Sequence, residues 1–209
     1  MDVIIVADEN ELKNLNINVV REKKVGPFVF KTIKINGTKV VICHSGISIA
    51  NAAACTQLAI NLFKPNKIIN FGAVGALKPC KLFDVIAPEK IFYHDVHTPW
   101  YDLGQVPGEP PFFTNKNDLK IDGQYNIASG SSFLTDVKQI KNISKKLDVY
   151  IFDMEVAAIA QIAHKNNVDL NVVKVVSDVI GFENTELKNI NENIKNAGQK
   201  AFEIIKKLF

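Results

Sequence analysis

Three acidic residues stand where predicted strands end. Glu11 follows the first apolar run of the chain, and Glu155 and Asp178 each follow a later one. Because open α/β sheets bind ligands beyond the carboxyl ends of their strands, we expect these carboxylates to converge on one mouth. Glu11 and Glu155 also have a purely structural explanation, since acids at a helix start cap the helix or complement its dipole. Asp178, at the carboxyl end of a buried strand, is harder to explain in this way.

Two segments rich in small residues are placed in the same way. Ser45–Ser48 lies between a strand and a helix, where free N–H groups can bind phosphate or a sugar hydroxyl; a plain turn with Ser48 as N-cap explains it equally well. Phe71–Ala76 is interpreted as the end of a strand in a glycine-spaced turn, which lets a ligand approach the backbone closely. It lacks the G-x-G-x-x-G order and the following acid, so a dinucleotide-binding Rossmann site is not supported.

Together these patterns place Glu11, Ser45, Gly72, Glu155 and Asp178 at one edge of the predicted sheet. The sequence offers neither a metal-ligand cluster nor a Ser/His/Asp order. Convergent carboxylates suit acid/base chemistry on a glycosidic bond, in which one acid protonates the leaving group and another orients water.

The composition narrows the class of protein. A chain of 209 residues with 47% hydrophobic side chains is long enough for one domain with a sizeable core. The net charge is only +3 and the lysines are scattered, which argues against nucleic acid as a partner. Arg21 is the only arginine, so a site built from several guanidinium groups is excluded.

The cysteines and the start of the chain indicate a compartment. Cys43, Cys55 and Cys80 show no metal-ligand spacing, and their apolar neighbours predict buried free thiols in a reducing environment. The first residues lack a basic region, and their apolar run is too short for a signal peptide or a membrane span. We therefore expect a soluble cytoplasmic protein with no membrane partner.

Apolar runs of strand length alternate with helical patterns. This alternation predicts a single-domain α/β/α sandwich over residues 1–209 with a mixed, largely parallel central sheet. Asn36–Gly37 predicts a type I′ turn between the strands Phe28–Ile35 and Thr38–Cys43. The other predicted strands are Val3–Ala7, Lys67–Phe71, Asp84–Ala87, Tyr125–Ala128, Val149–Phe152 and Asn171–Val176, and the predicted helices are Ile47–Phe63, Met154–Lys165 and Thr185–Leu208.

The stretch His94–Asn117 is rich in proline and aromatic residues. It cannot be regular structure throughout, and we expect a long functional or interface loop there. Trp100, Tyr101, Phe112 and Phe113 offer more aromatic surface than a solvent-exposed loop normally carries, which predicts a homodimer.

The order and spacing of nine segments resemble those of the 5′-methylthioadenosine/S-adenosylhomocysteine nucleosidases, hydrolytic members of the purine nucleoside phosphorylase superfamily. The likeness extends over nearly the whole chain. In that family the aromatic loop completes the 5′ pocket of the neighbouring subunit. The segments are Ala7–Glu11, Asn36–Thr38, Ser45–Ile47, Ile69–Leu77, Tyr93–Asp95, Gly104–Gly108, Ser129–Phe133, Asp153–Glu155 and Ser177–Val179.

The resemblance implies hydrolysis of adenine nucleosides with release of adenine, a purine nucleoside as the small-molecule partner, and neither a metal nor a cofactor. It implies that Asp178 protonates adenine N7, that Glu11 orients the attacking water, and that Glu155 holds the ribose 2′-hydroxyl. Carboxylates suit these roles because the transition state carries positive charge on the sugar. The implied substrate-binding residues are Ser45, Ile47, Ala73, Gly75, Phe133 (at the base), Met154 (under the ribose), Lys174 and Ser177 (beside Asp178).

The chain departs from the family pattern at four places. Lys174 stands where an arginine is expected, and Ser131 stands where an aspartate usually follows the Ser-Gly pair. Asp153 replaces the usual glutamate, and Ala73–Val74 replaces a common Ser or Val-Ala pair. These departures leave open which nucleoside is preferred, whereas the three acids of the chemistry are present.

Two other functions fit the same fold. A phosphate-dependent purine nucleoside phosphorylase needs several positive groups for a dianion, and Arg21 cannot supply them alone. A nucleoside-binding protein that has lost catalysis would account for the four departures. The presence of Glu11, Glu155 and Asp178 argues against that alternative.

Overall fold

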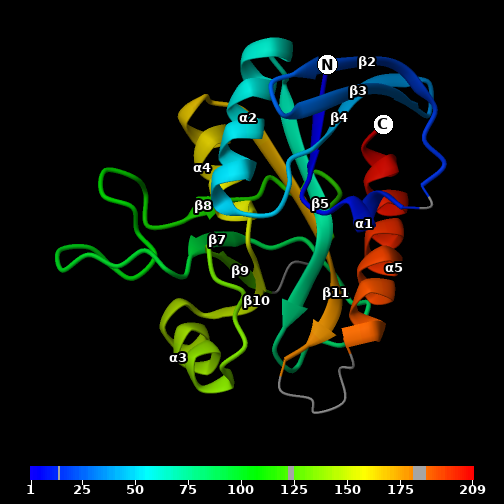
Figure 1. Cartoon of the computed structure of the whole chain (residues 1–209). Coiled ribbons are helices and arrows are strands. Elements are labelled where there is room, and N and C mark those ends of the chain that lie inside the picture. The colour runs from blue at the N-terminus through cyan, green and yellow to red at the C-terminus, as the bar shows by residue number, and fades with distance from the viewer. Residues whose placement is uncertain (14, 122–124, 181–186) are drawn as a thin grey trace.

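A mixed β-sheet runs through the molecule, and helices cover both of its faces (Figure 1). This computed structural model describes residues 1–13, 15–121, 125–180 and 187–209. The strands are β1 (Val3–Val6), β2 (Val19–Val25), β3 (Phe28–Ile35), β4 (Thr38–His44), β5 (Lys67–Ala76), β6 (Val85–Ile86), β7 (Lys90–Tyr93), β8 (Phe113–Thr114), β9 (Asn126–Ser129), β10 (Val149–Asp153) and β11 (Asp169–Val179). The helices are α1 (Glu9–Leu12), α2 (Ile49–Phe63), α3 (Val137–Leu147), α4 (Val156–Lys165) and α5 (Leu187–Ile205), which a 3₁₀ turn follows at Lys206–Leu208.

Strand β5 is the centre of the sheet. The strand order is β2-β3-β4-β1-β5-β10-β9-β7-β8, and β11 pairs with β5 outside this path. The pairing of β5 is parallel with β1 and β11 and antiparallel with β10. The segments that follow or end β1, β10 and β11 therefore meet along one strand. The predicted α/β/α sandwich is confirmed.

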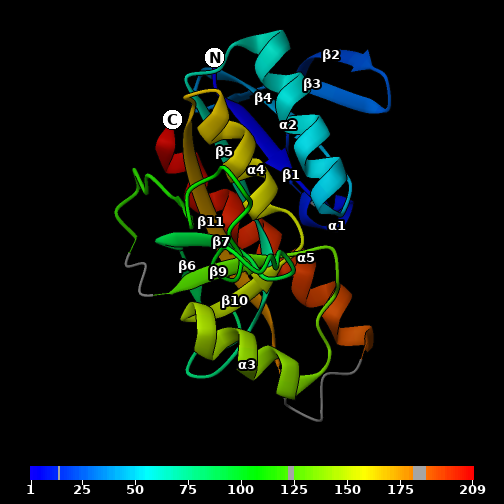
Figure 2. The ribbon, with the colours of Figure 1, turned by 90° about the vertical axis from the view of Figure 1, so that its left-hand side faces the viewer.

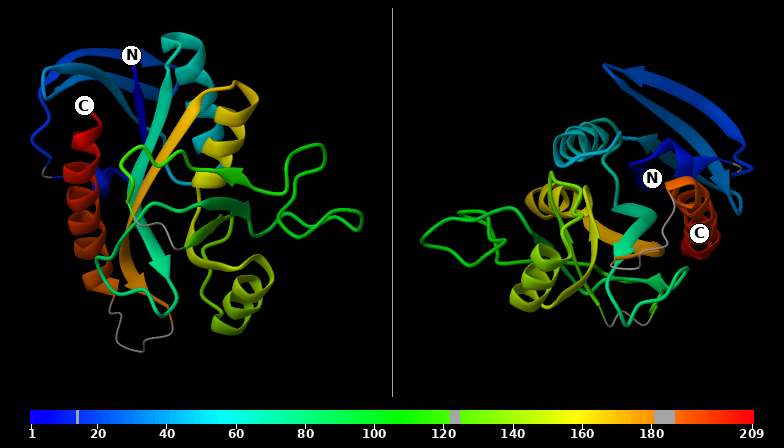
Figure 3. Two further views of the ribbon diagram at one scale, coloured as in Figure 1. Left: turned by 180° about the vertical axis from the view of Figure 1, so that it is seen from behind. Right: turned by 60° about the horizontal axis from the view of Figure 1, so that its bottom comes forward.

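The core is divided between the two faces of the sheet. Helices α2 and α4 pack together over one face, which Figure 2 shows toward the viewer. Helix α5 covers the other face and packs on β5 and β11, as the right-hand view of Figure 3 shows. All four residues of β1 are buried, because a parallel strand covered on both faces is apolar throughout.

The predicted turn at Phe71–Ala76 is wrong. Strand β5 continues to Ala76 and pairs with β11 along its whole length. Gly72 and Asp178 consequently lie within strands and not after them. Glycine is required at position 72 for another reason, because a Cβ there would overlap the carboxylate of Glu11.

Other local predictions have mixed outcomes. The type I′ turn is confirmed, since Asn36 and Gly37 have φ of 48° and 84° between paired β3 and β4. Helix α2 begins after Ser48, whose hydroxyl caps it. The predicted start of the last helix at Thr185 lies outside the described residues. None of the helices in the described ranges is both long and apolar enough to span a bilayer.

The sequence patterns did not predict β2, β7, β8 or α3. Strand β2 is exposed and charged, so no apolar alternation marks it, and it is held by antiparallel pairing to β3. Helix α3 does carry a signal: Asp136 caps it, and Ile140, Ile143 and Leu147 form a buried stripe at helical spacing.

Candidate active site

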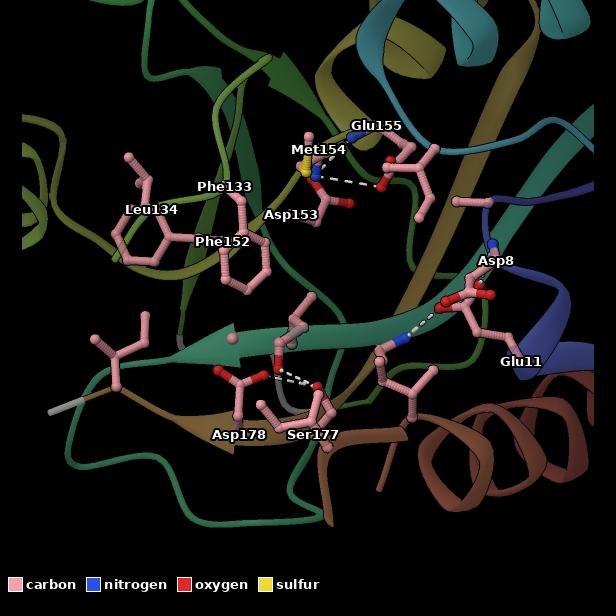
Figure 4. Close-up of a pocket in the computed structure, with 18 of the residues that line it drawn as sticks. Asp8, Glu11, Phe133, Leu134, Phe152, Asp153, Met154, Glu155, Ser177 and Asp178 are labelled. Carbon is pink, nitrogen blue, oxygen red and sulfur yellow. Dashed lines mark hydrogen bonds between the residues drawn. The ribbon is translucent and has the colours of Figure 1, made fainter. Parts of the chain in front are cut away.

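A pocket opens beside β5, where α1, the segment between β10 and α4, and the end of β11 come together (Figure 4). Figure 4 shows Asp178 nearer to Phe133 and Phe152, and Glu11 at the opposite end. Ser45 and Lys174 do not line the pocket. The predicted residues that do are Glu11, Ile47, Ala73, Gly75, Phe133, Met154, Glu155, Ser177 and Asp178.

Glu11 is fixed by its short helix and by close packing. Its carboxylate accepts hydrogen bonds from the N–H of Ala73 at 2.6 Å and of Asp8 at 3.2 Å, the second as part of a capping box. The carboxylate lies over Gly72. The backbone of Glu11 lies against Gly198 of α5, where a Cβ would come 2.5 Å from the backbone carbonyl oxygen of Glu11. Burial raises the pKa of Glu11, and the Lys174 charge and the two N–H groups oppose that rise.

Glu155 is held between two loops. It accepts hydrogen bonds from the N–H of Ser48 at 3.0 Å and of Met154 at 3.2 Å. Ser48 has φ of 117°, a conformation that L residues rarely adopt and that is typical of functional sites. Burial, followed by the nearby Asp153 charge, raises the pKa of Glu155 to about 7.

Two of the departures from the family pattern contact each other. Lys174 and Asp153 form an ion pair of 3.0 Å, with side chains 2% and 3% exposed. Asp153 also accepts from the Ser129 hydroxyl at 2.5 Å and from the Val156 N–H at 3.3 Å. Burial alone would lower the pKa of Lys174. The combined attraction of the charged amine to Asp153, Glu11 and Glu155 is larger, so the pKa is raised. Lys174 therefore acts from behind the pocket wall.

Asp178 lies at an irregularity near the end of β11. The Ser177 hydroxyl is 2.9 Å from its Oδ1 atom and 3.2 Å from the Val74 carbonyl oxygen. Gly75 leaves room for the acid, since a Cβ there would come 3.1 Å from Oδ2. Burial raises the pKa of Asp178, and the Ser177 hydrogen bond opposes the rise. A carboxyl group that keeps its proton longer than usual can serve as a general acid.

The wall near Asp178 is mostly apolar. Phe133 is 71% exposed although it lines the pocket, which leaves its ring free to lie on a planar ligand. Leu134 and Phe152 complete this wall, whereas Met154 lies beside Glu155 (Figure 4). The pocket can thus hold a flat base beside Asp178 and a polar group beside Glu11 and Glu155.

Several pocket residues were not predicted to have a role. Ile190 and Ile194 of α5 line the pocket, and their helical spacing alone gave no hint of a ligand. His94 is buried in the pocket wall, and its imidazole lies where a Cβ of Gly130 would be. The available signal was the place of His94 in the segment Tyr93–Asp95, which carries part of the family resemblance. Ser45 instead ties β4 to β1, because its hydroxyl is 3.2 Å from the Val6 carbonyl oxygen.

Among the described residues, no group of three or more His, Cys, Asp or Glu side chains could hold a metal ion.

The sequence model of the phosphorylase superfamily matches residues 2–209. The chain belongs to this superfamily. The resemblance predicted from the sequence is confirmed.

Relatives within the phosphorylase superfamily carry a more specific name. The 5′-methylthioadenosine/S-adenosylhomocysteine nucleosidase of Buchnera aphidicola subsp. Schizaphis graminum is 31% identical over 98% of this chain and 94% of its own. The Neisseria meningitidis nucleosidase in complex with methylthio-immucillin-A has a TM-score of 0.86 and 26% identity, and the match covers 99% of this chain and 97% of that one. The Streptococcus pneumoniae nucleosidase with 8-aminoadenine has a TM-score of 0.86 and 28% identity over 98% and 96%.

Proposed function

We propose that this chain hydrolyses the N-glycosidic bond of 5′-methylthioadenosine and S-adenosylhomocysteine and releases adenine. The observation that carries the proposal is one pocket with two differently held carboxyl groups, Asp178 beside an apolar wall and Glu11 at the far end. The nucleosidase relatives that match nearly the whole chain support it.

In the proposed reaction, the oxygen of a water molecule bonds to C1′ as the bond from C1′ to N9 breaks. Asp178 gives its proton to N7, so that adenine leaves as a neutral base, and Glu11 accepts a proton from the water. Glu155 accepts a hydrogen bond from the 2′-hydroxyl, and its charge favours the cationic ribosyl transition state. The products are adenine and the free 5′-substituted ribose.

Phosphorolysis has less support. Arg21 lies on the exposed strand β2 and does not line the pocket. Lys174, the other candidate for binding phosphate, is buried behind the wall in its ion pair with Asp153. A phosphate dianion would therefore face Glu11 and Glu155 without a guanidinium or ammonium group from either of these residues.

Chromatography of the products tests the proposal. The purified protein is incubated with a panel of adenine nucleosides, with and without phosphate, and free base and sugar are quantified. We expect adenine and free ribose product at the same rate in both buffers. A ribose 1-phosphate product that requires phosphate would favour the phosphorylase, and saturable binding without adenine release would favour a protein that has lost catalysis.

The assembly that we propose is a cytoplasmic homodimer. Trp100 and Tyr101 are 85% and 42% exposed, and the segment between β7 and β8 that contains them projects from the body of the molecule (Figure 1). Phe112 packs on Phe92, and Phe113 is buried. The rings of Phe112 and Phe113 therefore add less to the exposed aromatic surface of this loop than the sequence predicted. Cys43, Cys55 and Cys80 are buried free thiols, which suits a reducing compartment.

Sedimentation equilibrium tests the dimer. We expect a dimer for the parental protein and dissociation for Trp100→Ser, because removal of the exposed ring takes away an aromatic anchor. A fully active monomer at micromolar concentration would contradict this assembly.

A further inference from the structure

Helix α5 contacts the strand segment that carries Asp178. The side-chain amide of Asn193 donates a hydrogen bond to the carbonyl oxygen of Ser177 at 3.0 Å. Asn193 is half-buried, and its neighbours Ile190 and Ile194 line the pocket from the same helix. The contact therefore lies at the edge of the pocket, one residue before the proposed general acid.

The Ser177 carbonyl group, which accepts this hydrogen bond, belongs to a β-bulge. Along the parallel ladder, Val176 is opposite Val74, but Asp178 is opposite Gly75, so Ser177 is an extra residue in β11. A bulge changes the direction of the following side chains and takes the backbone of the extra residue out of the regular ladder. The Ser177 carbonyl consequently needs a donor from elsewhere, and Asn193 provides one.

We propose that Asn193 is a positioning residue that fixes the bulge at Ser177 and thereby directs the carboxyl group of Asp178 toward the leaving base. This inference rests on the proposed function. The Ser177 hydroxyl donates to the Asp178 carboxyl group, and the Asn193 amide holds the Ser177 carbonyl group, whose peptide bond leads to Asp178. Without the amide, the peptide group between Ser177 and Asp178 can rotate toward another donor, and the acid moves with it.

The chain offers a matched control for the test. Asn196 lies one turn further along α5 and is exposed, so Asn196→Ala repeats the chemical change without the contact. Asn193→Ala removes the amide, and Asn193→Leu keeps the branched shape of the side chain without a donor. Thermal unfolding of each variant checks that α5 still packs, so that a loss of activity is not mistaken for a loss of fold.

Turnover of 5′-methylthioadenosine is then measured for each variant in the parental background and in the Asp178→Asn background. We expect both Asn193 variants to lower kcat about 10- to 100-fold with KM little changed, since misplacement by about 1 Å has effects of this size. In the Asp178→Asn background the same substitutions should cause no further loss, because Asn193 acts through Asp178.

Two results would overturn the inference: a kcat within about twofold of the Asn196→Ala control, or an equal loss in both backgrounds. A parental protein that releases no adenine would instead refute the proposed function, so the two failures are distinguishable.

Discussion

The two ends of the pocket are held in different ways. At one end, Glu11, Asp153, Glu155 and Lys174 form a buried charge cluster whose carboxylates accept hydrogen bonds from backbone N–H groups. At the other end, Asp178 is half-buried and contacts the Ser177 hydroxyl, next to an apolar wall.

This difference matches two kinds of chemical task. Carboxylates that favour a cation must stay charged in a buried place, so they need donors and a counter-ion that are already fixed when the reaction begins. A general acid must keep its proton, and every N–H group that stabilised its carboxylate would lower its pKa. Burial raises the pKa of all three carboxyl groups; Lys174 and backbone N–H groups oppose that rise at Glu11 and Glu155, and at Asp178 the Ser177 hydroxyl opposes it.

The largest effect is expected from Asp178→Asn, which removes the transferable proton and keeps the size of the side chain. Turnover of adenine nucleosides should fall by about 10²- to 10⁴-fold, as measured by adenine release. A nitrophenyl riboside should show a smaller defect because its leaving group needs no proton. Asp148→Asn, at an exposed αL position where asparagine fits well, is the control. Turnover near the parental rate would leave Asp178 without a catalytic role.

Lys174→Met tests whether the buried charge cluster depends on its counter-ion. Breaking a buried pair leaves Asp153 uncompensated, so the free energy of unfolding in urea should fall by about 3–5 kcal/mol. The double variant Lys174→Met/Asp153→Asn should recover part of this loss. Lys141→Met, at an exposed position of α3, is the control, with little expected change. A stability equal to that control would mean that the cluster tolerates an unpaired carboxylate.

Glu155→Gln separates charge from structure in the same cluster. We expect a folded protein whose turnover falls about 10²- to 10³-fold, because an amide cannot favour a cationic sugar. Folding raises the pKa of Glu155 from 4.5 to about 7. The folded state thus holds a proton that the unfolded state releases, and parental stability should fall by up to about 3 kcal/mol as the pH rises through this window.

Thermal melts between pH 4.5 and 8 measure that linkage. The Gln variant lacks the titrating group, so its stability relative to the parental protein should increase as the pH rises. If Glu155 only complements the dipole of α4, the substitution should change stability by at most about 1 kcal/mol and leave turnover unaffected.

Sequence reasoning predicted the fold better than the fine geometry of the site. Alternating apolar runs were sufficient for the sandwich, and the rule that ligands gather at strand ends brought Glu11, Glu155 and Asp178 into one pocket. The function of Gly72 was misjudged, because its packing against the Glu11 carboxylate joins residues far apart in the sequence, and the packing of Gly198 against the Glu11 backbone was not predicted for the same reason.

Lys174 shows a second limit of sequence reasoning. The sequence shows that arginine and glutamate are replaced by Lys174 and Asp153, but not that the two side chains contact each other. The bulge at Ser177 and its donor Asn193 are also tertiary features, since they depend on the register of β11 against β5 and on the position of α5.

The smallest effect is expected from Phe133→Ala, which tests whether the wall near Asp178 is a binding surface that the fold does not need. Phe133 is 71% exposed, so its removal should leave thermal stability almost unchanged. Stacking of a base on an aromatic ring contributes about 1–3 kcal/mol, so KM for adenine nucleosides should rise about 5- to 100-fold. The proton transfer itself does not use the ring, and kcat should change less than KM.

Phe133→Leu separates stacking from bulk, because leucine keeps apolar contact without a planar face. An unchanged KM in both variants would show that the base does not lie on Phe133, whereas a large loss of stability would show that this end of the pocket is as firmly built into the fold as the buried charge cluster.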